Sequence, residues 1–191
     1  MKTFLVVASG NSGKVKEFRE LLAELPLTVV PQPDGLIVDE TGTTFAENAR
    51  IKALTVSSYT EELVLADDSG LSVEALNGAP GIYSARYAKT DSERINRLLK
   101  ELEPFDDRNA VFTAALCIAK KEKIILEVEG RCNGVITTTP RGEEGFGYDP
   151  VFEVLDLGKT FAEIGIQQKR LFGHRGKAFE LLMPELKKIL G

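Results

Sequence analysis

The chain has 191 residues, of which 43% are hydrophobic and 28% are charged, and its formal net charge is −5. This composition is typical of an ordinary globular protein, and the length fits one domain with a sizeable core, so we expect residues 1–191 to form a single domain. The acidic balance argues against a nucleic acid polymer as a partner, because such a polymer is bound through a basic face. A single nucleotide remains possible, since a few local cations can hold it.

Cysteine, histidine and apolar runs indicate the compartment. Cys117 and Cys132 lie far apart in the sequence, there is no Cys-x-x-Cys pair, and His174 is the only histidine. This pattern argues against a structural zinc site and favours free thiols in a reducing cytoplasm. The apolar run at the N-terminus is too short for a signal peptide, because polar residues follow from Ser9, and no segment approaches the length of a membrane span. We therefore expect a cytoplasmic protein with no membrane partner.

Strands and helices are predicted to alternate in the first half of the chain. Apolar runs and helical periodicity place them in this order: strand 4–8, helix 14–24, strand 27–30, helix 43–59 and strand 63–66. The first strand reads as covered on both faces, because its apolar run is continuous. Thr44 and Glu47 have the spacing of a capping box at the start of the second helix. The last strand is expected to run directly into Asp67-Asp68-Ser69-Gly70.

The second half predicts a helix, a hairpin and a final helix. Their expected ranges are helix 92–102, strands 110–119 and 123–135, and helix 173–190. The polar turn at 120–122 joins the two strands as a hairpin. The apolar stripe of the last helix consists of Ala178, Leu181, Leu182, Leu186 and Ile189. Together the elements indicate a mixed α/β fold.

The first candidate site is Ser9-Gly10-Asn11-Ser12-Gly13-Lys14, between a strand and a helix. Backbone amides at a helix start favour phosphate, and the lysine adds a positive charge. The segment is not a Walker A loop, because only two residues separate its first glycine from the Gly-Lys pair and Val15 follows the lysine. An ordinary turn capped by Asn11 or Ser12 explains the pattern equally well.

The second and third candidates are clusters of carboxylates. Asp67-Asp68-Ser69-Gly70 follows a buried strand, and adjacent buried carboxylates are costly unless a cation neutralises them. Magnesium fits such oxygen ligands, and a carboxylate there can also activate a water molecule. Asp39 and Glu40 offer further carboxylates. The alternatives are a common Asp- and Ser-rich turn in the first case and a polar loop leading into a helix cap in the second.

The remaining candidates lie in the last third of the chain. In Gly145-Phe146-Gly147-Tyr148-Asp149-Pro150, two glycines flank an aromatic residue, which lets the backbone approach a ligand while a ring stacks on a base. A tight turn before a strand is the alternative. Lys169 and the pair His174-Arg175 bring three potential cations to the start of the final helix. A positive cluster is unfavourable at a helix N-terminus, which favours a function over a solvated basic helix start.

In combination and in this order, the motifs resemble the inosine triphosphate pyrophosphatase family, also called the XTP/dITP diphosphatases. The matching stretches are Ser9-Gly10-Asn11 with Lys14 and Glu17, Glu40-Thr41-Gly42 with Thr44-Phe45 and Glu47-Asn48-Ala49, Ala66-Asp67-Asp68-Ser69-Gly70-Leu71, Gly78-Ala79-Pro80-Gly81-Ile82-Tyr83-Ser84-Ala85-Arg86, Gly145-Phe146-Gly147-Tyr148-Asp149-Pro150 and His174-Arg175. Each stretch is weak alone, but six in the right order are specific, and they cover residues 6–182.

The resemblance implies a mixed α/β fold with a long central sheet flanked by helices, two lobes with a substrate cleft between them, and a homodimer. It implies hydrolysis of ITP, dITP and XTP to the monophosphate and pyrophosphate with Mg²⁺. Asp68 would be the proton acceptor and a magnesium ligand, and Glu40, with Asp39, would support the metal. The substrate would contact Ser9, Gly10, Asn11, Ser12, Gly13, Lys14, Ser69, Phe146, Gly147, Tyr148, Asp149, Lys169, His174 and Arg175.

Two departures from the family pattern concern the base. The family has Asn after the lysine matched by Lys169 and Ser before the His-Arg pair, whereas this chain has Arg170 and Gly173. Glycine still serves as a helix N-cap, so the helix start is expected to survive. Two rival functions remain open at this point: a related pyrophosphatase that prefers pyrimidine or modified nucleotides, and a nucleotide-binding module without catalysis.

Overall fold

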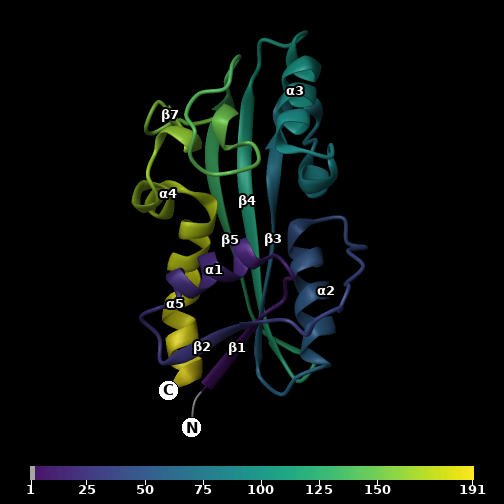
Figure 1. Ribbon diagram of the computed structural model, residues 1–191, viewed down its shortest axis with the longest axis vertical. Helices are drawn as coiled ribbons and strands as arrows, with labels where there is room; N and C mark the ends of the chain where they lie inside the picture. The colour runs from purple at the N-terminus through teal and green to yellow at the C-terminus, as the bar shows by residue number, and fades with distance from the viewer. Residues whose placement is uncertain (1–2) are drawn as a thin grey trace. The chain divides into compact units, whose positions relative to one another are not determined.

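The computed structural model describes residues 3–191, so residues 1 and 2 of the predicted domain lie outside the described residues. The elements are β1 (Thr3–Val7), α1 (Ser12–Leu21), β2 (Leu27–Pro31), α2 (Phe45–Ser57), β3 (Leu63–Val73), α3 (Asp91–Leu102), β4 (Asn109–Lys120), β5 (Lys123–Ile136), β6 (Phe152–Val154), β7 (Lys159–Thr160), α4 (Ile166–Phe172) and α5 (His174–Leu190) (Figure 1). Short 3-10 helices are η1 (Glu74–Leu76), η2 (Gly81–Arg86), η3 (Asp149–Val151) and η4 (Phe161–Glu163).

The strands of residues 3–191 form one seven-stranded sheet in the order β2-β1-β3-β4-β5-β6-β7. β1 is parallel to β2 and β3, whereas β6 is antiparallel to β5 and β7, so the sheet is mixed. The predicted mixed α/β fold with flanking helices is confirmed. Within the same residues, no helix is both long enough and apolar enough to cross a membrane.

The described chain divides into two compact units. Unit 1 contains the chain up to Asp68, the segment Ala115–Glu129 and the end of the chain from Ala178. Unit 2 contains Ser69–Ala114 and Gly130–Lys177. The predicted single domain and the predicted substrate cleft stay predictions.

In unit 1, α2 covers one face of the parallel strands. Ala49 and Ala53 of α2 are buried against a cluster of small and β-branched residues that includes Val6 of β1 and Val64 of β3. The small alanine side chains allow the helix to approach the sheet closely. On α1, Phe18 is fully buried, and its ring centroid lies 5.5 Å from that of Phe179 on α5.

In unit 2, the core is more aromatic. The amphipathic helix α3 contributes Ile95, Leu98 and Leu102, all buried. The rings of Phe112 on β4 and Phe152 on β6 lie 4.7 Å apart, edge to face. A core of this kind gives the loops of unit 2 a rigid support.

Three predicted elements are confirmed with small changes of boundary. α3 begins at Asp91, and β4 and β5 form the expected hairpin. The hairpin turn places Lys121 and Glu122 at φ angles of 51° and 58°, as a tight two-residue turn requires. Both cysteines are buried free thiols, as expected. Burial raises the pKa of the Cys117 thiol to about 12 and that of the Cys132 thiol to about 11, so neither is poised to react.

The alternative of a turn at Asp67-Asp68-Ser69-Gly70 is wrong, and the strand expected at 63–66 is too short. β3 continues through these residues to Val73, so the short strand expected at 63–66 is the first third of a long one. Turn-forming residue types are only a correlation, and here the place of β3 inside the sheet, next to β4, overrides it. The correction matters for the site, because the two carboxylates lie on an extended strand.

The predicted stripe of α5 is partly wrong. Ala178, Leu182 and Leu186 are fully buried, but Leu181 is 55% exposed and Ile189 is 38% exposed. The buried residues follow a strict four-residue spacing, which leaves Leu181 on the flank of the helix. Two further elements, α4 and β7, were not predicted, since both are too short to show a period.

Candidate active site

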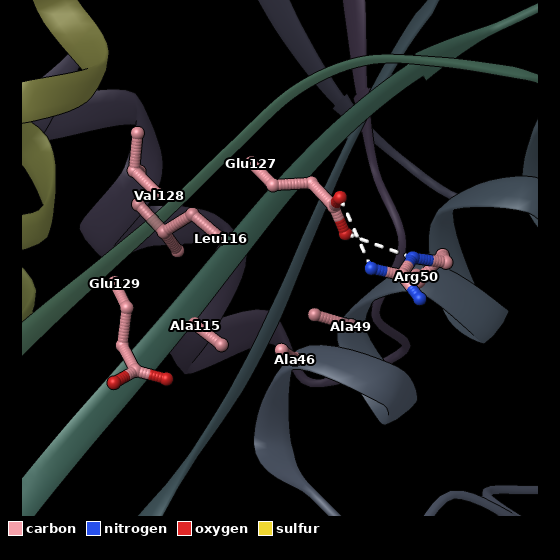
Figure 2. Close-up of a pocket in the computed structure, with 8 residues that line it drawn as sticks. All are labelled: Ala46, Ala49, Arg50, Ala115, Leu116, Glu127, Val128 and Glu129. Carbon is pink, nitrogen blue, oxygen red and sulfur yellow. Dashed lines mark hydrogen bonds and ion pairs between the residues drawn. The ribbon is translucent and has the colours of Figure 1, made fainter.

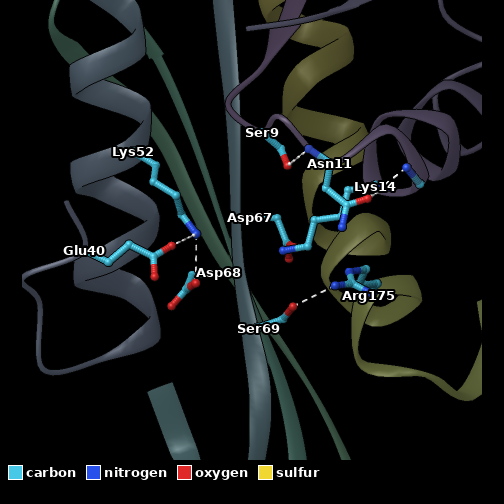
Figure 3. A network of polar contacts seen from close by, with 10 residues as sticks. Ser9, Asn11, Lys14, Glu40, Lys52, Asp67, Asp68, Ser69 and Arg175 are labelled. Carbon is cyan, nitrogen blue, oxygen red and sulfur yellow. Dashed lines mark hydrogen bonds and ion pairs between the residues drawn. The ribbon is translucent and has the colours of Figure 1, made fainter. Parts of the chain in front are cut away.

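Asp67 and Asp68 are consecutive residues of β3, so their side chains point to opposite faces of the strand. Figure 3 shows the Asp67 carboxylate turned toward Lys14 and the Asp68 carboxylate turned toward Glu40 and Lys52. Both aspartates are buried, and a buried carboxylate is costly unless a cation compensates it. Each carboxylate therefore has its own lysine, and the two lie on different sides of the strand.

The Lys52 ammonium joins the two carboxylates that the sequence assigned to metal binding. Its Nζ atom lies 2.8 Å from Asp68 Oδ1 and 2.7 Å from Glu40 Oε1. The side chains of Lys52 and Asp68 are each 11% exposed, so this pair is largely shielded from water. Glu40 and Asp68 thus converge on one point, where they hold a positive charge.

Burial and charge act against each other at this cluster. Burial raises the pKa of the Asp68 carboxyl, and the charge of Lys52 and its hydrogen bond only partly offset that rise. Burial alone would lower the pKa of the Lys52 ammonium, but its interactions with Asp68 and Glu40 outweigh burial and raise that pKa. Lys52 therefore stays charged, while Asp68 holds its proton to a higher pH than an exposed aspartate does.

The loop that carries Glu40 is fixed to the start of α2. The amide of Gly42 donates to Oδ1 of Asn48, at 2.9 Å, and Asn48 is fully buried. A Cβ atom at Gly42 would lie 2.7 Å from that same oxygen, so a side chain there would push the loop away. Thr44 caps α2 by accepting from the Glu47 amide, at 3.1 Å.

The predicted capping box forms with a shift of one residue. The Glu47 carboxylate accepts from the amide and the hydroxyl of Thr43, at 2.7 and 2.8 Å. These hydrogen bonds from Thr43 lower the pKa of Glu47. Asp39, the other predicted metal ligand, is exposed, so the geometry favours Glu40 for that role.

Lys52 is the functional candidate that the sequence analysis missed. It lies on the same face of α2 as Ala49, Ala53 and Val56, which are all buried. A lone lysine on an apolar helix face is a signal, because a buried lysine requires an anionic partner. The partner Asp68 is 16 residues away on a strand, which periodicity alone does not place.

The segment from Ser9 to Lys14 forms a capped helix start. Asn11 is the N-cap of α1, and its Oδ1 accepts from the amides of Gly13 and Lys14, at 2.9 and 3.2 Å. Ser9 Oγ accepts from the Asn11 amide, at 3.1 Å. The alternative of a turn capped by Asn11 is therefore confirmed as local structure, and phosphate binding by the same exposed turn stays a prediction.

Lys14 connects this turn to the central strand. Its Nζ atom lies 2.9 Å from Oδ2 of Asp67, whose side chain is 1% exposed, while the Lys14 side chain is 26% exposed. The ammonium thus has one side on a buried carboxylate and another side that solvent reaches. Such a charge can be shared with an incoming phosphate.

In unit 2, the predicted residues Ser69 and Arg175 lie together. Arg175 Nη2 donates to Ser69 Oγ, at 2.7 Å, and Arg175 is buried (Figure 3). His174 instead packs in the aromatic core, where its ring stacks on Phe112 with centroids 4.7 Å apart. The alternative of a solvated basic helix start is therefore wrong for both residues.

Glycine shapes the start of α5. Gly173 is the N-cap, because its carbonyl accepts from the Lys177 amide, at 3.1 Å, as expected. A Cβ atom there would lie 2.4 Å from the Lys169 carbonyl oxygen, so this chain needs glycine at the position. The arrangement lets α5 begin directly after α4 ends and sets the direction of the Arg175 side chain.

Four of the predicted residues lie in or beside the loop before η3. They are Phe146, Tyr148, Asp149 and Lys169, the last of which comes from α4. Asp149 is buried and its Oδ2 accepts from the Phe146 amide, at 3.0 Å, and from Lys169 Nζ. The same Nζ lies 4.9 Å from the centroid of the Phe146 ring, which is exposed. Tyr148 is buried, and its hydroxyl donates to the Ser84 carbonyl, at 2.8 Å. Of the two aromatic residues, only Phe146 therefore presents a ring to a ligand.

The residues present fit a magnesium ion that the substrate helps to hold. Among residues 3–191, no group of three or more His, Cys, Asp or Glu side chains could hold a metal alone. Magnesium commonly binds one or two carboxylates and completes its shell with water and substrate phosphates. Asp68 Oδ2 is buried without a hydrogen-bond partner in this part of the chain, so it is one such oxygen, and Glu40 supplies a second carboxylate.

Unit 1 also contains a separate hollow. It has a volume of about 200 Å³ and is lined by Ala46, Ala49, Arg50, Ala115, Leu116, Glu127, Val128 and Glu129 (Figure 2). Arg50 and Glu127 face each other there in a two-pronged ion pair, with Nε–Oε1 at 2.9 Å and Nη2–Oε2 at 3.1 Å. None of the predicted site residues lines this hollow.

Comparison with known proteins agrees with the motifs. The model of the Ham1 family matches residues 5–185. A "dITP/XTP pyrophosphatase" from Prochlorococcus marinus (strain MIT 9313) is 65% identical over 187 residues, which are 97% of this chain and 92% of the relative.

Solved structures agree with the fold. A HAM1 protein from Coxiella burnetii matches with a TM-score of 0.89 at 42% identity, covering 97% of this chain and 99% of the other. The Ham1 protein of Staphylococcus aureus matches with the same TM-score at 38% identity, again covering 97% and 99%. Identity and coverage at this level confirm the predicted family.

Proposed function

This chain belongs to the Ham1 family, and we propose that it hydrolyses the non-standard purine nucleoside triphosphates ITP, dITP and XTP to the monophosphate and pyrophosphate. The reaction removes these nucleotides from the pool. The observation that carries the proposal is the buried cluster of Asp68, Glu40 and Lys52, with Lys14 and Asp67 on the other face of the strand. A plain nucleotide-binding module has no need of a buried carboxylate with an oxygen that lacks a partner. A pyrophosphate-release assay with ITP tests the proposal.

Asp68 and Glu40 would hold Mg²⁺ in this proposal. When bound, the ion supplies positive charge to the phosphate oxygens and lowers the pKa of a bound water molecule. Lys52 keeps the two carboxylates together and adds a fixed positive charge beside them. The predominantly buried position of Lys52 and Asp68 strengthens these interactions, because little water screens them.

The chain's own groups account for the rest of the chemistry. Asp68 accepts a proton from the attacking water, whose oxygen forms a bond to the α-phosphorus. The bond from that phosphorus to the bridging oxygen breaks, and pyrophosphate leaves. Lys14 neutralises the charge that grows on the leaving group. Positioning and charge stabilisation dominate in phosphoryl-group chemistry, so rigid support of these side chains is essential.

The base is assigned to the groups of unit 2. Phe146 offers an exposed ring for stacking, and Arg175 lies with its Cζ atom 6.0 Å from the centroid of that ring. Arg175 and backbone amides donate hydrogen bonds, so they match the 6-keto oxygen of hypoxanthine, xanthine and guanine. Adenine presents an amino group at that position, which places two donors face to face.

Selectivity should follow this donor pattern. We expect kcat/KM to be highest for ITP and XTP, low for GTP and lowest for ATP, because each unmade hydrogen bond in a desolvated site costs about 1–3 kcal/mol. Guanine differs from hypoxanthine only by its 2-amino group. Crowding near Phe146 therefore discriminates against guanine less strongly than unmade hydrogen bonds discriminate against adenine. A panel of the four nucleotides at one magnesium concentration measures the order.

Two results of that panel would contradict the assignment. If ATP is hydrolysed as fast as ITP, recognition of the keto group is wrong. If kcat/KM for GTP equals that for ITP, Arg170 and Gly173 have made the base site less selective than the family pattern implies. A pyrimidine nucleoside triphosphate assayed beside the panel tests the rival function, which faster turnover of that nucleotide would favour.

We also propose that the enzyme works as a homodimer in the cytoplasm. Family resemblance supports the dimer, and the two free buried thiols are consistent with a reducing compartment. Light scattering at micromolar concentration measures the mass of the assembly, and a mass of one chain would contradict the dimer.

A further inference from the structure

The loop that carries Phe146 requires external support. Gly145 and Gly147 flank the phenylalanine with φ angles of 81° and 64°, a region that glycine enters freely. Phe146 itself is 58% exposed, so its own packing fixes its ring only weakly. With flexible glycines on both sides, the ring would adopt many orientations unless hydrogen bonds fix the loop backbone at more than one point.

The loop is held from two directions. On one side Asp149 accepts from the Phe146 amide, as described above. On the other side the amide of Gly147 donates to Oδ2 of Asp91, at 2.8 Å. The two bonds clamp successive amides, so they fix the backbone on both sides of the Phe146 carbonyl.

Asp91 is a rigid anchor because it is the first residue of α3. The helix start is secured by a full capping box between Thr90 and Glu93. Asp91 Oδ1 also pairs with Arg94 Nη1, at 2.5 Å, which holds the carboxylate in one orientation. The first turn of α3 thus presents Oδ2 to a loop 56 residues further along the chain.

We propose that Asp91 is a positioning residue for nucleotide binding: by holding the Gly147 amide it fixes the Phe146 ring for stacking on the base. The inference rests on the proposed function, because that function assigns the base to this loop. Asp91 does not touch the substrate, and its effect passes through the loop backbone. Removing it should therefore weaken binding of the base far more than it slows the chemical step.

A pair of substitutions separates this role from simple support of the helix. Asp91→Ala removes the acceptor, whereas Asp91→Asn keeps a carbonyl oxygen that can accept from Gly147. We expect Asp91→Ala to raise KM for ITP about 3- to 10-fold, as loss of one hydrogen bond implies, with kcat within about twofold of the unchanged protein. Asp91→Asn should restore most of KM. The exposed Ser92 lies in the same turn of α3 and gives the matched control, so Ser92→Ala should leave KM unchanged.

A second readout does not depend on activity. The chain has no tryptophan, so a Phe146→Trp variant carries a single indole in the loop. In that background we expect Asp91→Ala to increase quenching of the indole by acrylamide, and Asp91→Asn to leave it near its starting value. Melting temperatures of all variants show whether α3 has been destabilised.

Three outcomes would overturn the proposal. They are equal effects of Asp91→Ala and Asp91→Asn on KM, a lower melting temperature with unchanged KM, and unchanged quenching in the tryptophan background. Failure of the proposed function looks different, because the unsubstituted protein would then release no pyrophosphate from ITP. In that case the quenching comparison alone decides whether Asp91 positions the loop.

Discussion

Replacing Asp68 by asparagine is expected to lower kcat for ITP by about 10²–10⁴-fold, the usual cost of losing a general base. Asparagine keeps the shape of the side chain but neither accepts the proton nor contributes a negative charge to the metal. Steady-state pyrophosphate release at saturating magnesium measures the loss. The exposed Asp34 gives a matched control, and Asp34→Asn should leave kcat unchanged.

The same variant should not be destabilised, and the sign follows from the pKa. Burial raises the pKa of Asp68 in the folded chain above the ordinary 3.8, so the folded state binds this proton more tightly than the unfolded chain does. The free energy of unfolding therefore falls as the pH rises from the pKa of Asp68 in the unfolded chain to its higher pKa in the folded chain. At neutral pH the ionised, buried carboxylate makes folding less favourable. Asp68→Asn removes this cost, but it also removes one of the two carboxylates that pair with the buried Lys52 and leaves Glu40 alone. The two effects oppose each other, so the melting temperature without metal at pH 7 should stay close to that of the unsubstituted protein. A folded variant with near-normal turnover would show that Asp68 is not the base.

Replacing Lys14 by alanine is expected to lower kcat/KM for ITP about 10- to 100-fold, as loss of a charged hydrogen bond implies. Both kcat and KM should change, because the ammonium binds the triphosphate and also neutralises the leaving pyrophosphate. Inhibition by free inosine should change much less, since a nucleoside carries no phosphate. Lys16→Ala is the matched control, because Lys16 is exposed on the same helix.

A control is needed for the carboxylate that Lys14 contacts. Asp67 is buried, so removing its lysine partner lowers stability as well as activity. The double variant Lys14→Ala, Asp67→Asn should recover melting temperature without recovering kcat/KM. Unchanged kinetics with ITP in Lys14→Ala would place the phosphates away from this turn.

The sequence predicted those elements whose signals are local. α3 has a capping residue and three apolar residues at helical spacing, and the β4–β5 hairpin has a polar turn between two apolar runs. These signals need only neighbours along the chain. They sufficed for the mixed α/β fold, and the ordered motifs sufficed for the family.

The path of β3 was not predictable from its residues alone. Asp67, Asp68, Ser69 and Gly70 favour a turn by local preference, but they belong to the long strand β3 inside the sheet and stay extended. Since a strand alternates its side chains, that extension separates the two carboxylates onto opposite faces. Because the two carboxylates lie on opposite faces of the strand, each pairs with a different lysine.

The candidate site was predictable in part. Spacing and resemblance gave Asp68, Glu40, Lys14, Phe146 and Arg175 as candidates. Lys52 and Asp91 were not predicted as site residues, because their hydrogen-bond partners lie 16 and 56 residues away in the chain. His174 and Tyr148 were predicted to contact the substrate, and this stays a prediction; that both rings lie in the buried core of unit 2 was not predictable from the motifs. Contacts over such distances are decided by packing, which a linear pattern does not contain.

Product analysis of ITP hydrolysis distinguishes the proposed reaction from other ways of cleaving the triphosphate. Purified protein is incubated with ITP and magnesium, with an excess of chelator in a parallel sample, and the products are separated by ion-exchange chromatography. The account predicts IMP and pyrophosphate in equal amounts, with no turnover in chelator. Release of orthophosphate with IDP, or full turnover in chelator, would contradict the reaction proposed for Asp68 and its neighbours.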